Sequence, residues 1–260
     1  MSQYNISFVG AGRVADALCR KMYAAGFNIE LIVSESKKNG PSLAGSCNAL
    51  WSSDLKFPNS TDIIIVSVPD HRLKTVLDKI TCCSETLVVH TAGSIGLDIF
   101  PDQLAHKGIF YPLQTFSLER KVNFQNLPFL LESSDEKSTS ILKSIVHSVG
   151  GKVYLVDTKN RQALHLAAVF ACNFSNHMLT LGKEIALNSD FAFDLLVPLI
   201  NETISKAIDI GPENSQTGPA VRHDHDTIKR HLELLSFSPE LQRIYDEMTG
   251  SIMNYYNKER

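Results

Sequence analysis

The sequence lacks the features that mark secreted, membrane-spanning or nucleic-acid-binding proteins. No charged segment followed by an apolar stretch opens the chain, and no apolar run approaches the roughly 20 residues that span a bilayer. The formal net charge is only -3, which gives no electrostatic footprint for nucleic acid or an anionic membrane. We therefore expect a globular protein of the cytoplasm that binds neither nucleic acid nor membrane.

Cysteine is also scarce. The chain has five cysteines, an odd number, and contains no Cys-x-x-Cys, so neither a disulfide framework nor a zinc ribbon fits. We expect the thiols to be reduced and structural. The stretch "HDHD" at 223–226 favours a polar loop that caps the following helix over a metal site. We therefore expect no bound metal.

The chain does contain enough apolar residues, 43% of 260, for a substantial core. In its first half, short apolar and β-branched runs alternate with helical patterns. Several runs are apolar on both faces, as is typical of parallel strands between helices. We predict a doubly wound α/β domain, a Rossmann fold, over residues 1–156. The predicted strands are 6–9, 29–33, 62–68, 86–90, 108–111, 129–131 and 152–156.

The second half follows helical spacing and shows no strand-like alternation. We predict an all-helical domain over residues 157–260. Its first helix is almost wholly apolar, and we expect it to be buried. In the first half, the stretch "SESKKNGPS" at 34–42 is the most loop-like. The predicted helices of the second domain are 159–188, 191–210, 226–236 and 239–256.

The turn after the first predicted strand, "GAGRVA", matches a dinucleotide-binding fingerprint. Gly10 permits a tight turn, Gly12 lets the backbone approach a pyrophosphate, and Ala15 is an accepted third residue. The free N–H groups at the start of the next helix would face the phosphates. A purely structural turn is the alternative. We predict a cofactor site that includes Gly10, Ala11, Gly12, Arg13 and Val14.

The end of the second predicted strand bears on which dinucleotide binds. An acidic side chain there would accept hydrogen bonds from the adenine ribose, and a basic group would receive a 2′-phosphate. Glu35 points to NAD, whereas Ser34, Ser36 and the two lysines at 37–38 could hold NADP. Local chemistry leaves both cofactors open.

Three further strand ends, in the stretches 66–71, 88–94 and 109–117, reach the edge where open α/β sheets place their ligands. The alternative is that Pro69–Asp70 and Gly93–Ser94 merely begin helices. We predict that the nicotinamide half of the cleft is lined by Val68, Pro69, Thr91 and Ala92. We predict that the substrate is positioned by Tyr111 and Gln114.

The predicted helix from Lys159 carries polar groups in an apolar sequence. At about 3.6 residues per turn, His165 shares an arc with Cys172 and Asn176, and Asn173 and His177 form an i, i+4 pair. Polar groups on a buried helix need partners, so they form either a hydrogen-bond network or the wall of a polar ligand site. We predict that the catalytic residues are His165, Asn173, His177 and Tyr111.

The loop "QTGPAVRHD" at 216–224 supplies two further substrate candidates, Thr217 and Arg222. A planar guanidinium binds a carboxylate in a bidentate fork that lysine cannot match. The alternative is that Arg222 pairs with Asp224 or Asp226 on the surface.

Five motifs carry a resemblance along nearly the whole chain: "VGAGRVA", "HTAGSI", "FYPLQTFS", "LHLAAVFACNFSNHM" and "QTGPAVRHDHDTIKRHLELL". Together they resemble the bacterial family provisionally named NADP oxidoreductases, in which a Rossmann-like domain precedes a helical domain of unknown function. That family is similar to pyrroline-5-carboxylate reductase and to the deazaflavin-dependent NADP oxidoreductases. The resemblance implies an NADP cofactor and a homodimer formed by the helical domain around the cleft. It implies no particular substrate.

Two departures from related patterns matter. Family members often have an arginine directly after the serine that ends the second strand, and Glu35 stands there, which keeps NAD open; Lys37 or Lys38 could substitute. The more distant β-hydroxyacid dehydrogenases have a catalytic lysine where this chain has Phe170. We therefore expect an NAD(P)-dependent oxidoreductase that reduces a C=N or C=O bond of a small substrate, acidic if Arg222 binds it. The alternative is a non-catalytic protein that senses nucleotides.

Overall fold

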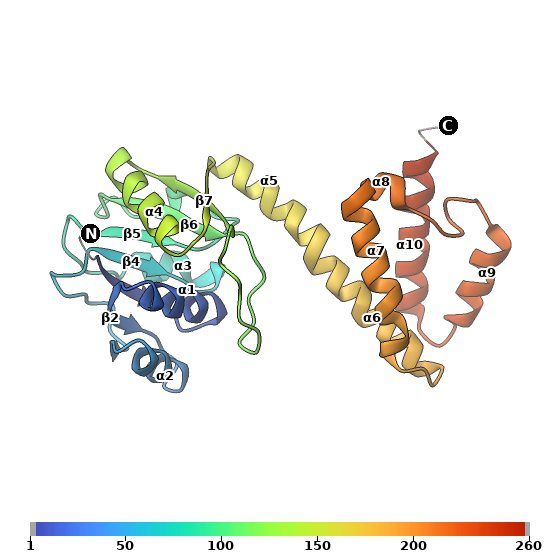
Figure 1. The fold of residues 1–260 in the computed structure, drawn as a ribbon, viewed down its shortest axis with the longest axis horizontal. Coiled ribbons are helices and arrows are strands. Elements are labelled where there is room, and N and C mark those ends of the chain that lie inside the picture. Colours follow the sequence, from blue (N-terminus) through green and yellow to red (C-terminus); the bar gives the residue numbers. More distant parts are fainter. Residues whose placement is uncertain (1–3, 258–260) are drawn as a thin grey trace. The chain divides into compact units, whose positions relative to one another are not determined.

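The computed structural model describes residues 4–257, and the chain divides into two compact units, residues 1–169 and 170–260 (Figure 1). The division predicted after residue 156 follows the change from strands to helices. The boundary between the two compact units instead lies between residues 169 and 170, inside a longer helical stretch. Its first segment, α5 (Thr158–Ala168), bonds to the sheet and belongs to the first unit.

The first unit confirms the predicted doubly wound α/β fold. In the described chain one sheet runs in the order β3-β2-β1-β4-β5-β6-β7-β8, with every neighbouring pair parallel except β6 and β7. Strand β3 was not predicted, because three largely exposed residues show no periodicity. The strands are β1 (Asn5–Val9), β2 (Asn28–Val33), β3 (Leu50–Ser52), β4 (Ile63–Val66), β5 (Leu87–His90), β6 (Lys107–Pro112), β7 (Pro128–Ser133) and β8 (Lys152–Leu155).

Helices cover both faces of this sheet. Successive residues of a strand point to opposite faces, so Ile6 and Phe8 of β1 pack into one core cluster and Val9 into the other. The first cluster also takes buried residues from α1 (Arg13–Ala24), α2 (Asn39–Ser46) and α4 (Glu136–Ser148). The second cluster takes buried residues from α3 (Asp70–Leu77). The short turn η1 (Leu97–Ile99) packs against this cluster.

Helix α2 corrects the prediction of a loop over 34–42, because the helix already begins at Asn39. Gly40 and Pro41 usually interrupt helices, but here they lie in the first turn, where a backbone N–H has no partner within the helix. A Cβ added to Gly40 would lie 2.1 Å from Ser34 Oγ and 2.3 Å from Trp51 Nε1. Glycine therefore allows α2 to pack closely against the end of β2.

The second unit is helical, as predicted. Asp224 caps α9 by accepting a hydrogen bond from the Thr227 backbone N–H at 3.0 Å, which is the capping role expected of the "HDHD" stretch. None of the described helices has the length and apolar character needed to cross a membrane. The segments are η2 (Val169–Phe174), α6 (Ser175–Asn188), η3 (Phe193–Leu196), α7 (Val197–Ile210), α8 (Pro212–Ser215), α9 (His225–Leu234) and α10 (Pro239–Tyr256).

The long helical stretch after Asp157 departs from the prediction in two respects. Segment η2 is a π-helix, whose i→i+5 bonding shifts the phase, so the predicted arc that joins His165 to Cys172 and Asn176 is wrong. The predicted burial is also wrong for the single chain, since Phe170 is 63% exposed and most neighbouring side chains of η2 and α6 are exposed. Apolar composition indicates that a helix needs a partner, but it does not require that partner to come from the same chain.

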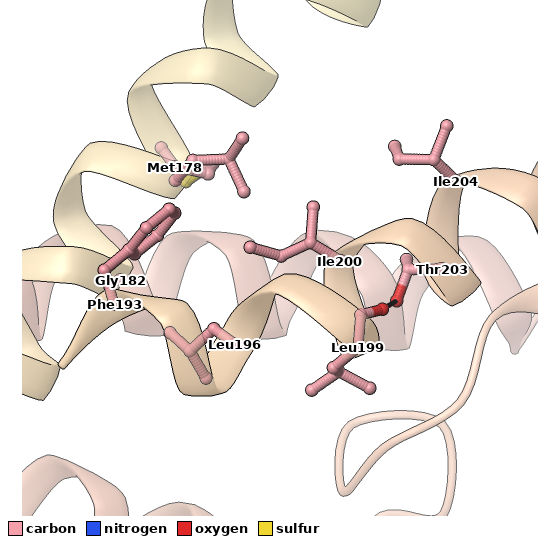
Figure 2. A pocket seen from close by; sticks show the side chains of 9 residues that line it. Met178, Gly182, Phe193, Leu196, Leu199, Ile200, Thr203 and Ile204 are labelled. Carbon is pink, nitrogen blue, oxygen red and sulfur yellow. Dashed lines mark hydrogen bonds between the residues drawn. The ribbon is translucent and has the colours of Figure 1, made fainter. Parts of the chain in front are cut away.

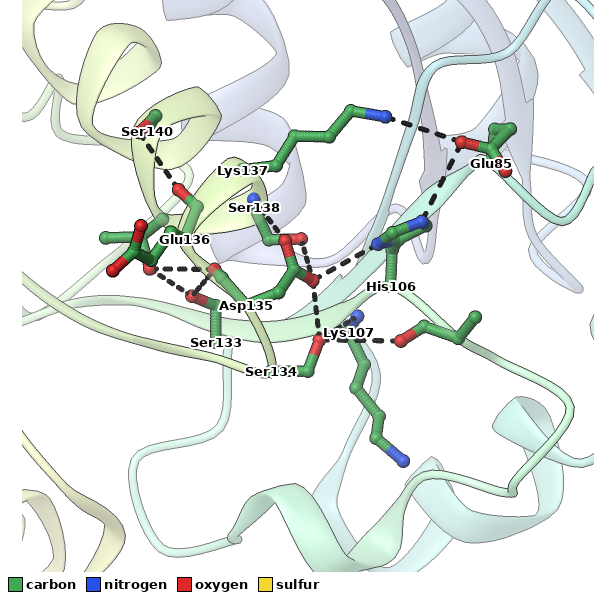
Figure 3. A network of polar contacts seen from close by, with 12 residues as sticks. Glu85, His106, Lys107, Ser133, Ser134, Asp135, Glu136, Lys137, Ser138 and Ser140 are labelled. Carbon is green, nitrogen blue, oxygen red and sulfur yellow. Dashed lines mark hydrogen bonds and ion pairs between the residues drawn. The ribbon is translucent and has the colours of Figure 1, made fainter.

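A polar network at the start of α4 joins this helix to β6 and β7 (Figure 3). The Asp135 carboxylate accepts hydrogen bonds from the Ser138 backbone N–H at 2.8 Å, Ser138 Oγ at 2.7 Å and Ser134 Oγ at 2.9 Å, and it lies 3.1 Å from His106 Nδ1. Partial burial acts to raise the pKa of Asp135. The hydrogen bonds outweigh that effect and hold the pKa well below its usual range.

We predict that Asp135→Asn lowers the free energy of unfolding at neutral pH by about 1 kcal/mol, because asparagine can still cap α4 but lacks the negative charge that strengthens the hydrogen bonds from Ser138 and Ser134. Because the pKa of Asp135 is depressed in the folded state, its stabilisation is complete above the ordinary aspartate pKa of about 4 and is lost as the pH falls below it. The loss proceeds as the pH falls towards the depressed folded-state pKa, so urea unfolding from about pH 7 to about pH 2 should show the difference between the two proteins shrinking in acid. Asp54→Asn, at an exposed aspartate after β3, is the control. A constant difference across this range would contradict the prediction.

Candidate functional site

The turn between β1 and α1 is held against the neighbouring strands by Gly10. Its φ of +104° favours glycine, and an added Cβ would lie 2.2 Å from the Ser67 carbonyl oxygen. Its backbone N–H donates to the Val33 carbonyl at 2.8 Å. The fold itself therefore requires glycine at position 10.

Gly12 differs from Gly10 in both respects. Its φ of -84° and ψ of -173° describe extended backbone that any residue adopts, and an added Cβ would meet no atom within 4 Å. It is the N-cap residue of α1 and offers no side-chain cap, so the amides of the first turn lie beside open space. A helix start of this kind can bind an anion, and the missing side chain leaves room for one.

A cavity of about 260 Å³ opens beside this turn, between the end of β2 and the start of α3. Its lining residues that were not predicted include Asn39 and Arg72. Asn39 was missed because α2 was expected to be a loop, and Arg72 because nothing near it in the sequence indicates its partner. The structure brings together around this cavity, from the predicted cofactor residues, Gly10, Ala11, Gly12, Ser34, Glu35, Val68 and Pro69.

Other predicted cofactor residues lie elsewhere. Arg13 is exposed at the start of α1 and does not line the cavity, and Val14 packs against the core instead. Lys37 and Lys38 do not line the cavity either. Ser34 does line it, but its hydroxyl lies 3.3 Å from both the Ser36 carbonyl and Trp51 Nε1.

The predicted nicotinamide residues Thr91 and Ala92 lie at the end of β5. Thr91 Oγ1 lies 2.7 Å from Ser67 Oγ, and the Ala92 backbone N–H donates to His90 Nδ1 at 3.2 Å. Burial lowers the pKa of His90 to about 4, so its imidazole is neutral and can accept this bond. The alternative interpretation, that these residue pairs merely begin helices, holds for Pro69 and Asp70, which begin α3. Gly93 and Ser94 begin no helix. Ser94 Oγ instead donates a hydrogen bond to the Asp70 carboxylate at 2.5 Å.

Tyr111 and His165 form a dyad beside this loop. Tyr111 Oη lies 2.9 Å from His165 Nδ1, and their rings meet edge to face. A Cβ added to Gly93 would lie 2.7 Å from Tyr111 and 2.8 Å from His165, so glycine is what lets the loop approach both rings. Burial, reinforced by the negative charge of Asp70, raises the pKa of Tyr111. The phenol therefore stays protonated at neutral pH.

Helix α5, which carries His165, is anchored by Arg161. This side chain is fully buried, forms an ion pair with Glu132 of β7, and donates through Nη2 to the Ile95 carbonyl at 2.6 Å. Thr158 Oγ1 donates to the same carboxylate at 2.9 Å, and Gln162 Nε2 donates to the Ser94 carbonyl at 2.8 Å. Arg161 was not predicted as a functional residue, although a lone arginine near the start of an apolar helix could have indicated a buried partner.

Of the remaining predicted catalytic and substrate residues, Gln114 lies in the first unit and the others lie in the second. Gln114 is exposed, and its side-chain oxygen accepts the Thr115 backbone N–H at 2.8 Å. In the part of the chain that the structure describes, Arg222 forms no ion pair with Asp224 or Asp226. Their predicted roles stay predictions. The exposed residues of the second unit among them are Asn173, His177, Thr217 and Arg222.

Comparison with known proteins identifies the family of this chain. A family model described as "NADP oxidoreductase coenzyme F420-dependent" matches residues 5–93, and a domain of unknown function, DUF2520, matches residues 127–252. A crystal structure from Bacteroides fragilis, provisionally named an NADP oxidoreductase, is 37% identical, covers 97% of this chain and 98% of its own, and superposes with a TM-score of 0.89. The chain belongs to this family of NADP oxidoreductases. The resemblance stated from the motifs and the NADP cofactor of the family are thereby confirmed.

More distant structures share the fold of this NADP oxidoreductase. An imine reductase from a Pseudomonas species is 16% identical with a TM-score of 0.67, over 98% of this chain and 93% of its own. A pyrroline-5-carboxylate reductase from Coxiella burnetii is 15% identical with a TM-score of 0.59, over 99% and 98% of the two chains. At this identity the likeness concerns the fold alone. The comparison with curated proteins yields no significant match.

Proposed function

We propose that this oxidoreductase binds NADP(H) at the turn between β1 and α1 and reduces a C=N or C=O bond of a small substrate. The observation that carries the cofactor site is Gly12. Neither its backbone conformation nor its surroundings call for glycine, and the open space above it is free to hold a ligand. A pyrophosphate there would accept hydrogen bonds from the first amides of α1.

The proposed chemistry separates hydride transfer from proton transfer. NADPH, when bound, supplies the hydride. Tyr111 gives a proton to the substrate nitrogen or oxygen, and burial keeps its hydroxyl protonated until then. His165, in the tautomer that carries its proton on Nδ1, donates to the Tyr111 oxygen and leaves the phenolic hydrogen free for the substrate. In the second unit, Asn173, His177 and Thr217 are proposed substrate contacts, and Arg222 is the proposed ligand for a substrate carboxylate.

The cofactor site is tested by Gly12→Val. We expect an unchanged thermal unfolding midpoint without ligand, because the extended backbone and the open space accommodate valine. We also expect loss of the shift in this midpoint that NADPH gives the wild type, because the side chain would occupy the pyrophosphate site. Gly45→Val, at a position of α2 where an added Cβ also meets no atom within 4 Å, is the matched control. Binding of NADPH by Gly12→Val with wild-type affinity would place the cofactor elsewhere.

The proton donor is tested by Tyr111→Phe. In a screen of small cyclic imines, keto acids and imino acids with NADPH, we expect the variant to lose about 100-fold in kcat on any substrate that the wild type reduces. Affinity for NADPH should stay within about twofold of the wild type, since the hydroxyl is not in the cavity beside Gly12. An undiminished kcat would remove Tyr111 from the mechanism. A wild type that binds NADPH but reduces none of these compounds would favour the nucleotide-sensing alternative.

We also propose that the protein is a homodimer formed by its helical unit. Among the described residues of this unit, the buried side chains are few: Ala220, Ile228, Leu235, Leu241 and Thr249. By contrast, α6, η3 and α7 form an apolar groove of about 240 Å³, lined by Met178, Phe193, Leu199 and Ile204 among others (Figure 2). A Cβ added to Gly182 would meet nothing within 4 Å, which leaves room for a close approach. A second copy of the helical unit would cover this apolar surface.

Leu199→Glu tests the dimer. Leu199 lines the groove and is 64% exposed, so we expect a charge there to shift the molecular mass measured by sedimentation from dimer to monomer. Leu50→Glu is the matched control, because Leu50 is 70% exposed on β3, outside the groove. A wild type that sediments as a monomer, or a Leu199→Glu variant that stays dimeric, would contradict this interface.

The cytoplasmic location also remains part of the proposal. The five cysteines are thiols, and two of them, Cys19 and Cys47, lie buried with their sulfur atoms 3.3 Å apart without forming a disulfide. Such a pair fits a reducing compartment.

A further inference from the structure

Glu35 and Arg72 form a bidentate ion pair at the rim of the cofactor cavity. The two guanidinium nitrogens Nη1 and Nη2 donate to the two Glu35 carboxylate oxygens at 2.7 and 2.5 Å. Both residues line the cavity, Glu35 after the end of β2 and Arg72 in the first turn of α3. The position that reads the adenine ribose in this fold therefore carries an anion and a cation at once.

Arg72 has the chemistry that a 2′-phosphate needs. A guanidinium presents two parallel N–H groups to phosphate as readily as to carboxylate, and in the present structure these groups are aimed at Glu35. The start of α2 lies at the same rim, since Asn39, its first residue, also lines the cavity. The neighbouring lysines at 37 and 38 do not line it. Arg72 is thus the cavity-lining cation nearest to the Glu35 position.

We infer that Arg72 binds the 2′-phosphate of NADP(H) and that Glu35 competes with this phosphate for the same guanidinium, so that the pair sets the preference between NADP and NAD. The inference rests on the proposed cofactor site at Gly12. It assigns to α3 the phosphate-binding role that an arginine directly after Ser34 could have filled.

The exchange of a carboxylate for a phosphate is feasible because the ion pair is accessible to water. The Arg72 side chain is 46% exposed and that of Glu35 is 73% exposed, so separating them strands neither charge in the protein interior. A 2′-phosphate carries more negative charge than a carboxylate and offers three acceptor oxygens. Glu35, once displaced, can turn into solvent. Without a 2′-phosphate the pair stays closed, and the Glu35 oxygens can still accept hydrogen bonds from ribose hydroxyls.

The test compares two probes that differ only in this phosphate, 2′,5′-ADP and 5′-AMP, by calorimetric titration of the full chain. We expect Arg72→Met to weaken 2′,5′-ADP binding by about 10- to 100-fold and to leave 5′-AMP binding unchanged, since one charge-assisted contact is lost. We expect Glu35→Gln to strengthen 2′,5′-ADP binding by about 10-fold, because the competing anion is gone. Lys74→Met is the matched control: it removes a positive charge from the same helix, where Lys74 pairs with Asp78 outside the cavity.

Each outcome decides for or against the inference. The inference is supported if Arg72→Met loses the preference for the probe that carries the 2′-phosphate, measured as the ratio of the two dissociation constants, and Lys74→Met keeps it. An unchanged ratio in Arg72→Met, an equal loss in Lys74→Met, or weaker 2′,5′-ADP binding in Glu35→Gln overturns it while leaving the cofactor site intact. A wild type that binds neither probe, nor NADP or NAD, overturns the proposed cofactor site and this inference with it.

Discussion

The buried contact between Arg161 and Glu132 is the constraint on which the first unit depends most. Removing an arginine and a carboxylate from water is costly, and breaking such a pair by losing one partner typically costs about 3–5 kcal/mol. Here the ion pair ties α5 to β7, and the second guanidinium nitrogen ties both to the loop after β5. Because that loop carries Thr91 and Ala92 while α5 carries His165, one buried side chain helps to set the positions of the proposed nicotinamide wall and of the dyad proposed to donate the proton.

The two units differ in how completely they bury their apolar side chains. The sheet buries its apolar strands between helices on both faces and presents its polar groups at the strand ends, where the cavity and the dyad lie. The helical unit leaves many large apolar side chains exposed in the single chain. The first unit thus has the core that a rigid cofactor site needs, whereas the second would reach its full packing through association.

The sequence was informative where a physical signal is local. Strands such as Ile63–Val66, fully buried, and the glycine turn after β1 could be predicted because each pattern lies within a few residues. Helix α2 was missed because Gly40 and Pro41 resemble helix breakers unless the helix start is known. The π-helical segment η2 shifted side chains away from the predicted arc, and periodicity alone cannot reveal such an insertion. Arg72 and Arg161 were missed because their acidic partners lie 37 and 29 residues away.

The contrast between Gly10 and Gly12 has a consequence for how this family can diverge. Selection for a stable fold keeps glycine at position 10, because its backbone conformation and the nearby Ser67 carbonyl exclude side chains. Among the residues that the structure describes, none constrains position 12 to glycine in this way, whereas a bound ligand would. A descendant that stopped using a nucleotide would be free to lose Gly12 while keeping Gly10. Variation at these two positions across the family would therefore distinguish lineages that kept the cofactor from lineages that kept only the scaffold.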